Sequence, residues 1–107
     1  DVHEIIIIVS EDKTTKESHE HIKKNIKKHQ SKIKLYFQKL PYLGGAIRDG
    51  FSIASGSHIL MMGSDLETNP FDVKKMILIS KKKSDSIITA SRWLDNGNFI
   101  NYGFFKY

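Results

Sequence analysis

The run Ile5–Val9 (IIIIV) constrains the fold more than any other part of the sequence. Successive β-branched residues with no polar face are typical of a strand that is buried on both sides in a parallel sheet. The run is far shorter than the roughly 20 apolar residues that a membrane-spanning helix needs. We therefore predict a strand over residues 4–9 and an α/β fold with helices on both faces of its sheet.

Further strands and helices alternate along the rest of the chain. Apolar segments predict strands over residues 33–37, 58–62 and 86–90, and polar or amphipathic segments predict helices over 15–29, 46–55 and 70–82. Strands that alternate with helices form parallel βαβ units. The predicted fold is one domain over residues 1–107, with a three-layer, doubly wound and mostly parallel sheet.

The glycines and one proline set the expected boundaries. Gly44 and Gly45 predict a tight turn into the second helix, Gly50 a close approach of that helix to the sheet, and Gly56 the end of the helix. Asn69 and Pro70 are typical of a helix cap and first helical position. The glycines match neither a dinucleotide fingerprint nor a Walker loop, so a helix N-terminus that faces a phosphate is the alternative to a purely structural role.

The charge balance is basic but spread out. The chain has 17 Lys and Arg, 12 Asp and Glu, and a net charge of +5. Lysine pairs and triplets at 23–24, 27–28 and 81–83 are typical of solvated helix faces and ends, and a weak attraction to phosphates or an anionic membrane surface is the alternative. No base-reading or stacking motif is present, so specific nucleic-acid binding is not expected.

Other classes of chemistry lack the residues they need. The chain has no cysteine, which excludes a disulfide framework, thiolate zinc ligands and thiol catalysis. The Gly-x-Ser-x-Gly elbow of serine hydrolases is missing, and the five histidines are not spaced as metal ligands. We expect a cytoplasmic protein, with the cytoplasmic face of a membrane as a further location, because no cationic segment precedes the first apolar run as in a signal peptide.

Polar segments follow three of the predicted strands, where open α/β sheets bind their ligands. In the second of these segments, Asp65 and Glu67 stand two residues apart, so both carboxylates can lie on one side of an extended loop. Carboxylate oxygens suit Mg²⁺ or Mn²⁺. A divalent metal site is one interpretation of this pair, and capping charges for the following helix are the other.

Four segments, in this order, resemble the family 2 glycosyltransferases, most closely the dolichyl-phosphate mannose synthase type. They are LGGAIRDGF at 43–51, ASGSHILMM at 54–62, SDLETNP at 64–70 and IITASRW at 87–93. The resemblance covers residues 4–93. It implies a GT-A fold, a nucleotide-diphosphate sugar donor, a divalent metal (Mg²⁺ or Mn²⁺) and transfer with inversion at the anomeric carbon.

The resemblance also assigns roles to individual residues. Asp65 falls on the last Asp of the family's metal motif, and Glu67 falls on a further polar metal contact of this subgroup. Glu11 falls in the acidic pair that lines the nucleotide pocket, and Arg92 falls on a contact to the acceptor phosphate, which an Arg fork suits. The residues expected to bind the nucleotide are Glu11, Asp12, Gly44, Gly45 and Ser64, and those expected to take part in catalysis are Asp65 and Arg92.

The sequence departs from the family pattern at three positions. Gly63 stands where the first metal-motif Asp belongs, Ser10 replaces the first acid of the nucleotide-pocket pair, and Lys13 replaces a small residue. The chain also begins at the family's second strand and ends before the acceptor-side region. We therefore expect an internal fragment that is inactive by itself and that is either marginally stable or self-associates through open strand edges.

The predicted function is a glycosyltransferase that uses a nucleotide-diphosphate sugar and a phosphate-bearing lipid or saccharide acceptor. A degenerate, non-catalytic nucleotide-binding domain is the first alternative, motivated by Gly63 and Ser10. A basic module that binds nucleic acid or an anionic membrane is the second.

Overall fold

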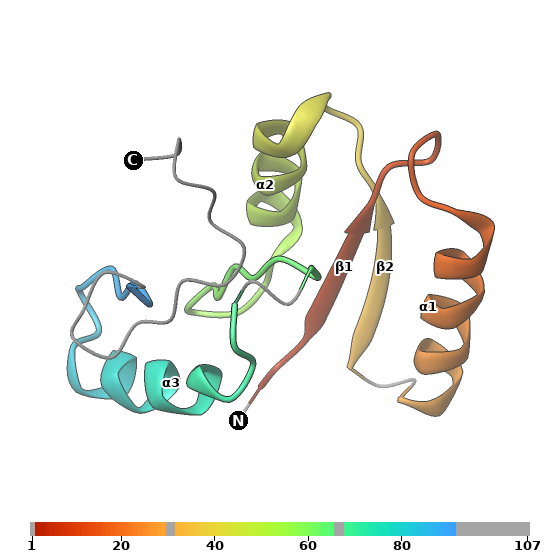
Figure 1. The fold of residues 1–107 in the computed structure, drawn as a ribbon. Coiled ribbons are helices and arrows are strands. Elements are labelled where there is room, and N and C mark those ends of the chain that lie inside the picture. The colour runs from red at the N-terminus through yellow and green to blue at the C-terminus, as the bar shows by residue number, and fades with distance from the viewer. Residues whose placement is uncertain (1, 30–31, 66–67, 92–107) are drawn as a thin grey trace, which may run out of the picture. The chain divides into compact units, whose positions relative to one another are not determined.

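A computed structural model describes residues 2–29, 32–65 and 68–91. Five elements follow one another in these ranges: β1 (Ile5–Val9), α1 (Lys16–Lys28), β2 (Ile33–Phe37), α2 (Tyr42–Ile53) and α3 (Asp72–Lys82) (Figure 1). The chain divides into two compact units, Asp1–Met61 and Met62–Tyr107. The first unit contains β1, α1, β2 and α2, and the second contains α3. The single domain over residues 1–107 stays a prediction.

The two strands form a parallel pair. Their register runs from Ile5 opposite Ile33 to Val9 opposite Phe37. Backbone hydrogen bonds continue beyond both ends, where the Ile5 N–H donates to the Lys32 carbonyl at 2.7 Å and the Gln38 N–H to the Val9 carbonyl at 2.9 Å. The predicted strands over residues 4–9 and 33–37 are confirmed, and so is their parallel pairing through a helix.

The two helices of the first unit cover opposite faces of the strand pair. On α1, the His19 ring stacks against Phe37 of β2 with centroids 5.8 Å apart. On α2, a Cβ added to Gly50 would lie 2.5 Å from the Ile8 Cδ1 atom of β1. Ile8 and Val9 project to opposite faces, and Phe37 is the register partner of Val9, so the two contacts lie on different faces (Figure 1). The close approach predicted at Gly50 is confirmed.

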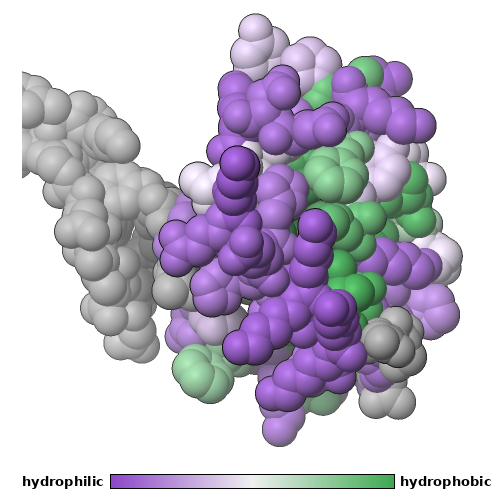
Figure 2. Space-filling view, turned by 90° about the vertical axis from the view of Figure 1, so that its right-hand side faces the viewer, coloured by the Kyte–Doolittle hydropathy of each residue, from purple (hydrophilic) through white to green (hydrophobic). Residues whose placement is uncertain are grey.

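Helix α1 begins and ends as predicted. The Thr15 side chain caps it by accepting a hydrogen bond from the Ser18 N–H at 3.2 Å, and Lys27 and Lys28 occupy its last turn. Lysine side chains at the helix C-terminus complement its dipole. Figure 2, seen from the side of α1, shows hydrophilic side chains over much of this face. The lysine-rich segment is thus a solvated helix face.

Helix α2 differs from the prediction at both ends. It starts at Tyr42, with Pro41 as its N-cap, so Gly44 and Gly45 lie in the first helical turn and do not form a turn before it. It ends at Ile53 with Ala54 as the C-cap, so Gly56 does not terminate it. Pro41 fixes its own φ and can precede the first helical turn without losing a needed N–H donor, so the helix starts closer to the proline than the glycines suggest.

Helix α3 starts two residues later than predicted. Asn69 does not cap the helix itself, because its carbonyl accepts from the Asp72 N–H at 3.1 Å and its side chain accepts from the Phe71 N–H at 3.1 Å. Pro70 and Phe71 therefore belong to a turn that precedes Asp72. Asparagine side chains commonly stabilise turns in this way.

The predicted strands over residues 58–62 and 86–90 are wrong. Both segments are described, and neither is hydrogen-bonded to a strand. The side chains of Ile59, Leu60, Met61 and Met62 are between 41% and 63% exposed, and Ile87 is 95% exposed. A β-branched or apolar composition makes a segment suitable for a strand but does not make it one. A strand forms only where a neighbouring strand pairs with it. The sheet of the described residues therefore has two strands, and the doubly wound, three-layer sheet and the self-association stay predictions.

The described hydrophobic residues form a small core. Val9 is 7% exposed and is the one hydrophobic residue among them that counts as buried, whereas Ile5 is 47% exposed. The prediction that the whole run Ile5–Val9 is buried on both faces is therefore only partly right. One helix on each face of two strands cannot cover every side chain at the ends of the run.

The Glu4 side chain links the start of β1 to β2 and to the segment after α2. Its Oε2 atom lies 2.8 Å from the Lys34 Nζ atom of β2, and its Oε1 atom accepts hydrogen bonds of 2.7 Å from both the backbone N–H and the hydroxyl of Ser55, beyond α2. The Lys34 ammonium and then the two Ser55 donors lower the pKa of Glu4 to about 2. These bonds favour the ionised carboxylate.

We expect Glu4→Gln to destabilise the chain at neutral pH and to have little effect near pH 2. The folded state lowers the pKa of Glu4 from 4.5 to about 2, so its contribution is complete above pH 4.5 and disappears as the pH falls toward 2. Denaturant midpoints of the two proteins, measured from pH 7 to pH 2, should converge in this window. Glu20→Gln on α1 is the control. A constant difference across the range would contradict the role of ionised Glu4.

Candidate functional site

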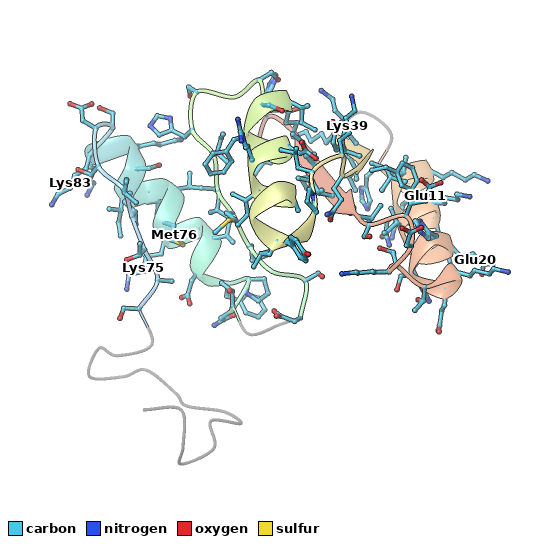
Figure 3. All side chains as sticks on the ribbon, turned by 90° about the horizontal axis from the view of Figure 1, so that it is seen from above. Glu11, Glu20, Lys39, Lys75, Met76 and Lys83 are labelled. Atoms are coloured by element: carbon cyan, nitrogen blue, oxygen red, sulfur yellow. The ribbon has the colours of Figure 1, made fainter. Side chains whose placement is uncertain are left out.

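A pocket of about 520 Å³ lies at the carboxyl ends of β1 and β2. Its lining residues come from the loop after β1, the loop after β2 and the first turn of α2. They are Ser10, Glu11, Asp12, Lys13, Gln38, Lys39, Leu40, Pro41, Tyr42 and Leu43. Figure 3 looks down on this end of the strands and shows Glu11 and Lys39 on the two loops.

The topology explains why a pocket forms here. The loop after β1 leads to α1 on one face of the strand pair, whereas the loop after β2 leads to α2 on the other face. Loops that leave neighbouring parallel strands toward opposite faces diverge and leave a crevice at the carboxyl edge, where α/β proteins bind ligands.

The first wall of the pocket is the turn after β1. A hydrogen bond of 3.1 Å from the Thr14 N–H to the Ser10 carbonyl closes it. Glu11 and Asp12, both predicted to bind the nucleotide, lie in this turn with exposed side chains. The Lys13 ammonium lies 5.9 Å from the centre of the Tyr42 ring, so this wall also contacts the opposite one.

The second wall is the loop after β2, whose residues were not predicted from the sequence. Asp49 of α2 accepts hydrogen bonds from the backbone N–H groups of Lys39 at 2.6 Å and Leu40 at 3.1 Å. Asp49 is only 7% exposed. The Gln38 side chain donates to the carbonyl of Leu40 at 2.8 Å. Lys39 adds a cationic side chain to the pocket lining.

A sequence signal for Asp49 was present. Asp49 and Gly50 both lie three or four residues from Ala46 and from Ile53, so the four residues share one face of the helix. Gly50 was predicted to face the sheet, so the position of Asp49 beside it on the same helix face was a signal of burial that the prediction did not use. A buried carboxylate needs hydrogen-bond partners, and the adjoining loop provides them.

Gly44 and Gly45, which were predicted to bind the nucleotide, lie beside the pocket and differ in their surroundings. A Cβ added to Gly45 would meet the Leu40 backbone carbon and oxygen at 2.5 Å, whereas one added to Gly44 would meet nothing within 4 Å. Neither glycine lines the pocket. The structure therefore gives Gly45 a packing role against the second wall, and the phosphate contact of both glycines stays a prediction.

The predicted metal ligands Asp65 and Glu67 belong to the second unit, as do the predicted site residues Ser64 and Arg92. Ser64 and Asp65 form an exposed bend, while Glu67 and Arg92 lie outside the described residues. A Cβ added to Gly63 would lie 2.9 Å from Asp65 Oδ1, so the carboxylate folds back over this glycine. In the described part of the chain, no three His, Asp or Glu residues gather as a metal site. The carboxylate of Asp65 is chemically suited to a hard divalent cation.

The fold and the pocket define an α/β protein that has a polar pocket at the carboxyl edge of its parallel strands. The sequence matches glycosyl transferase family 2 over residues 3–105, and the chain belongs to this family. Comparisons with curated proteins and with solved structures found no match. The resemblance is confirmed at the level of the family, which indicates a glycosyltransferase that uses a nucleotide-sugar donor and an acceptor. None of the described helices is long and apolar enough to cross a membrane.

Proposed function

We propose that the pocket at the ends of β1 and β2 binds the nucleotide of a nucleotide-diphosphate sugar, and that the sugar is transferred with inversion to a phosphate-bearing lipid or saccharide. The observation that carries this proposal is the position of Glu11 and Asp12. Both line a pocket at the carboxyl edge of a parallel strand pair in a family 2 chain. The dolichyl-phosphate mannose synthase type and the GT-A fold are the finer parts of this proposal.

The charges of the pocket suit a nucleotide. Glu11 and Asp12 provide acceptors for ribose hydroxyl and base N–H groups, and Lys13 and Lys39 provide cations for phosphate oxygens. The first turn of α2 adds backbone N–H groups at the positive end of a helix dipole. A pocket with both kinds of group can bind the two chemically different ends of a nucleoside diphosphate.

Asp65 and Glu67 are the residues proposed to hold a divalent metal, and Ser64 is proposed to contact the nucleotide beside them. When bound, Mg²⁺ or Mn²⁺ would neutralise the charge that develops on the departing diphosphate. Arg92 is proposed to bind the acceptor phosphate. An anionic phosphate oxygen can attack without a general base, whereas a hydroxyl acceptor requires one.

The test is calorimetric titration of the chain with UDP and with GDP in the presence of MnCl₂. We expect the double variant Glu11→Gln/Asp12→Asn to lose about tenfold or more in affinity, because hydrogen bonds to charged groups contribute about 1.5–3 kcal/mol. The matched control is Glu17→Gln/Glu20→Gln on α1, which removes the same charge outside the pocket lining. Equal or tighter nucleotide binding by the pocket variant would contradict the proposal, because general charge attraction alone predicts that result.

A nucleotide-binding domain without transferase activity is the second candidate. The observation that favours it is Gly63, which stands where the family pattern has its first metal-binding Asp. Metal-dependent nucleotide binding without turnover of any donor sugar would support this candidate. Binding of nucleic acid or of anionic vesicles that falls steeply with salt and is unchanged by added nucleotide would instead support a basic binding module.

A further inference from the structure

We propose that Asp49 is the positioning residue of the pocket: it holds the loop after β2 in the shape that admits the nucleotide. This inference rests on the proposed function, because it concerns how that pocket obtains its affinity. Asp49 itself does not line the pocket, so its effect on a ligand has to pass through the loop.

The contacts of Asp49 are concentrated on this loop. One carboxylate oxygen, Oδ2, accepts from two successive backbone N–H groups, those of Lys39 and Leu40, at 2.6 and 3.1 Å. Hydrogen bonds to an ionised acceptor are stronger than neutral ones. Because Asp49 is 7% exposed, its burial has a desolvation cost that only such bonds offset. Asp49 thus connects the loop to α2, and among the described residues it is the one charged side chain that is buried.

The same loop is also held by a hydrogen bond within it and by one to the start of α2. The Gln38 Nε2 atom donates to the carbonyl oxygens of Leu40 at 2.8 Å and Tyr42 at 3.5 Å. Asp49 therefore binds two N–H groups of the loop, while Gln38, at the start of the loop, binds the carbonyls of Leu40 and Tyr42. The Leu40 backbone is further confined by Gly45, whose position leaves no room for a Cβ atom.

The restraint matters because the loop ends in an unfavourable conformation. Tyr42 has a φ of 63°, and it is the one non-glycine residue with positive φ in the described ranges. This region is uncommon for a bulky side chain and persists only where surrounding contacts impose it. Tyr42 and Lys39 both line the pocket. Release of the loop from Asp49 would let Tyr42 relax and would move both side chains.

The test compares Asp49→Ala, Asp49→Asn and Ser52→Ala in the chain. Asp49→Ala removes the acceptor, whereas Asp49→Asn keeps one oxygen in a side chain of the same shape. Ser52→Ala is the control on the same helix, because the Ser52 hydroxyl donates to the Asp49 carbonyl at 2.7 Å and does not bind the loop. Three quantities are measured: the affinity for UDP and GDP with MnCl₂, the exchange rates of the Lys39 and Leu40 amide protons, and the thermal midpoint.

We expect Asp49→Ala to lose about tenfold or more in nucleotide affinity and to speed exchange of the two amide protons by a similar factor. Asp49→Asn and Ser52→Ala should stay within about threefold of the original chain, which is roughly 0.7 kcal/mol. If Asp49→Ala fails to fold, Asp49→Asn decides: fast exchange of both amides together with unchanged nucleotide affinity would overturn the role.

The outcomes separate this inference from the proposed function. Binding by the original chain and equally by Asp49→Ala would overturn the positioning role and leave the nucleotide site intact. Equal losses in Asp49→Ala and Ser52→Ala, in step with their thermal midpoints, would also overturn it, because they would report only the stability of α2. If the original chain binds neither UDP nor GDP, the proposed function fails, and the positioning role fails with it.

Discussion

Replacing Asp65 with alanine should abolish the Mn²⁺-dependent part of nucleotide binding. The proposal gives Asp65 a direct metal bond, and the loss of even an outer-shell partner lowers metal affinity by about 10–100-fold. We therefore expect a loss of more than about a hundredfold in calorimetric titrations with UDP and GDP in MnCl₂. The same titrations in EDTA should show no difference between the variant and the original chain.

Variants of neighbouring residues test whether this effect is specific. Glu67→Ala should weaken binding less than Asp65→Ala, because it is proposed as the additional metal contact. Asp85→Ala removes an exposed acid from the same unit and serves as the matched control. Unchanged Mn²⁺-dependent binding in Asp65→Ala would remove the proposed metal role.

Gly63→Asp restores the first acid of the family's metal motif. A Cβ atom at this position would lie 2.9 Å from Asp65 Oδ1, so the Asp65 carboxylate has to move before both acids fit. The two like charges would also repel each other unless a cation lies between them. We expect this variant to be less stable without metal and to gain more thermal stability from MnCl₂ than the original chain.

Gly45→Ala should destabilise the first unit by about 1–3 kcal/mol, the usual effect of an atom forced into a filled space. The added Cβ would meet the backbone carbon and oxygen of Leu40 at 2.5 Å. Backbone atoms cannot rotate away as the end of a side chain can, so the loop after β2 or the first turn of α2 has to shift. Because Leu40 lines the pocket, nucleotide affinity should fall together with stability.

Gly44→Ala is a control one residue away. Its Cβ would meet nothing within 4 Å, and alanine is the better helix former by about 0.5 kcal/mol or more. The two variants should therefore shift the denaturation midpoint in opposite directions. A stabilising or neutral Gly45→Ala would show that α2 does not approach Leu40 as closely as described.

The features that were predictable from the sequence depend on neighbours along the chain. The strands Ile5–Val9 and Ile33–Phe37 are linked by one helix, so their parallel pairing follows from a single βαβ unit. Helix α1 carries its own cap at Thr15 and its own cationic end. Gly50 was correctly expected to face the sheet because a glycine on the apolar face of a helix permits close packing.

The features that the sequence did not predict depend on partners far away in space. The segments at 58–62 and 86–90 have the composition of strands, but the described residues supply no neighbour that pairs with them. The start of α2 was predicted after the glycines, whereas the helix begins at Tyr42, directly after Pro41, and Gly45 of its first turn packs against Leu40.

For the candidate site, the sequence by itself determined the family, the acids Glu11 and Asp12 and their place after the first strand. Those depend on residue identity and on the rule that ligands bind at the carboxyl ends of parallel strands. Only the tertiary structure showed that the loop after β2, bound by Asp49, forms the second wall of the pocket. Asp49 lies about ten residues from Lys39 along the chain, and the packing of α2 on β1 brings its carboxylate within 2.6 Å of the Lys39 amide. A hydrogen bond of this kind requires two elements to be docked first, and local sequence preference does not specify that docking.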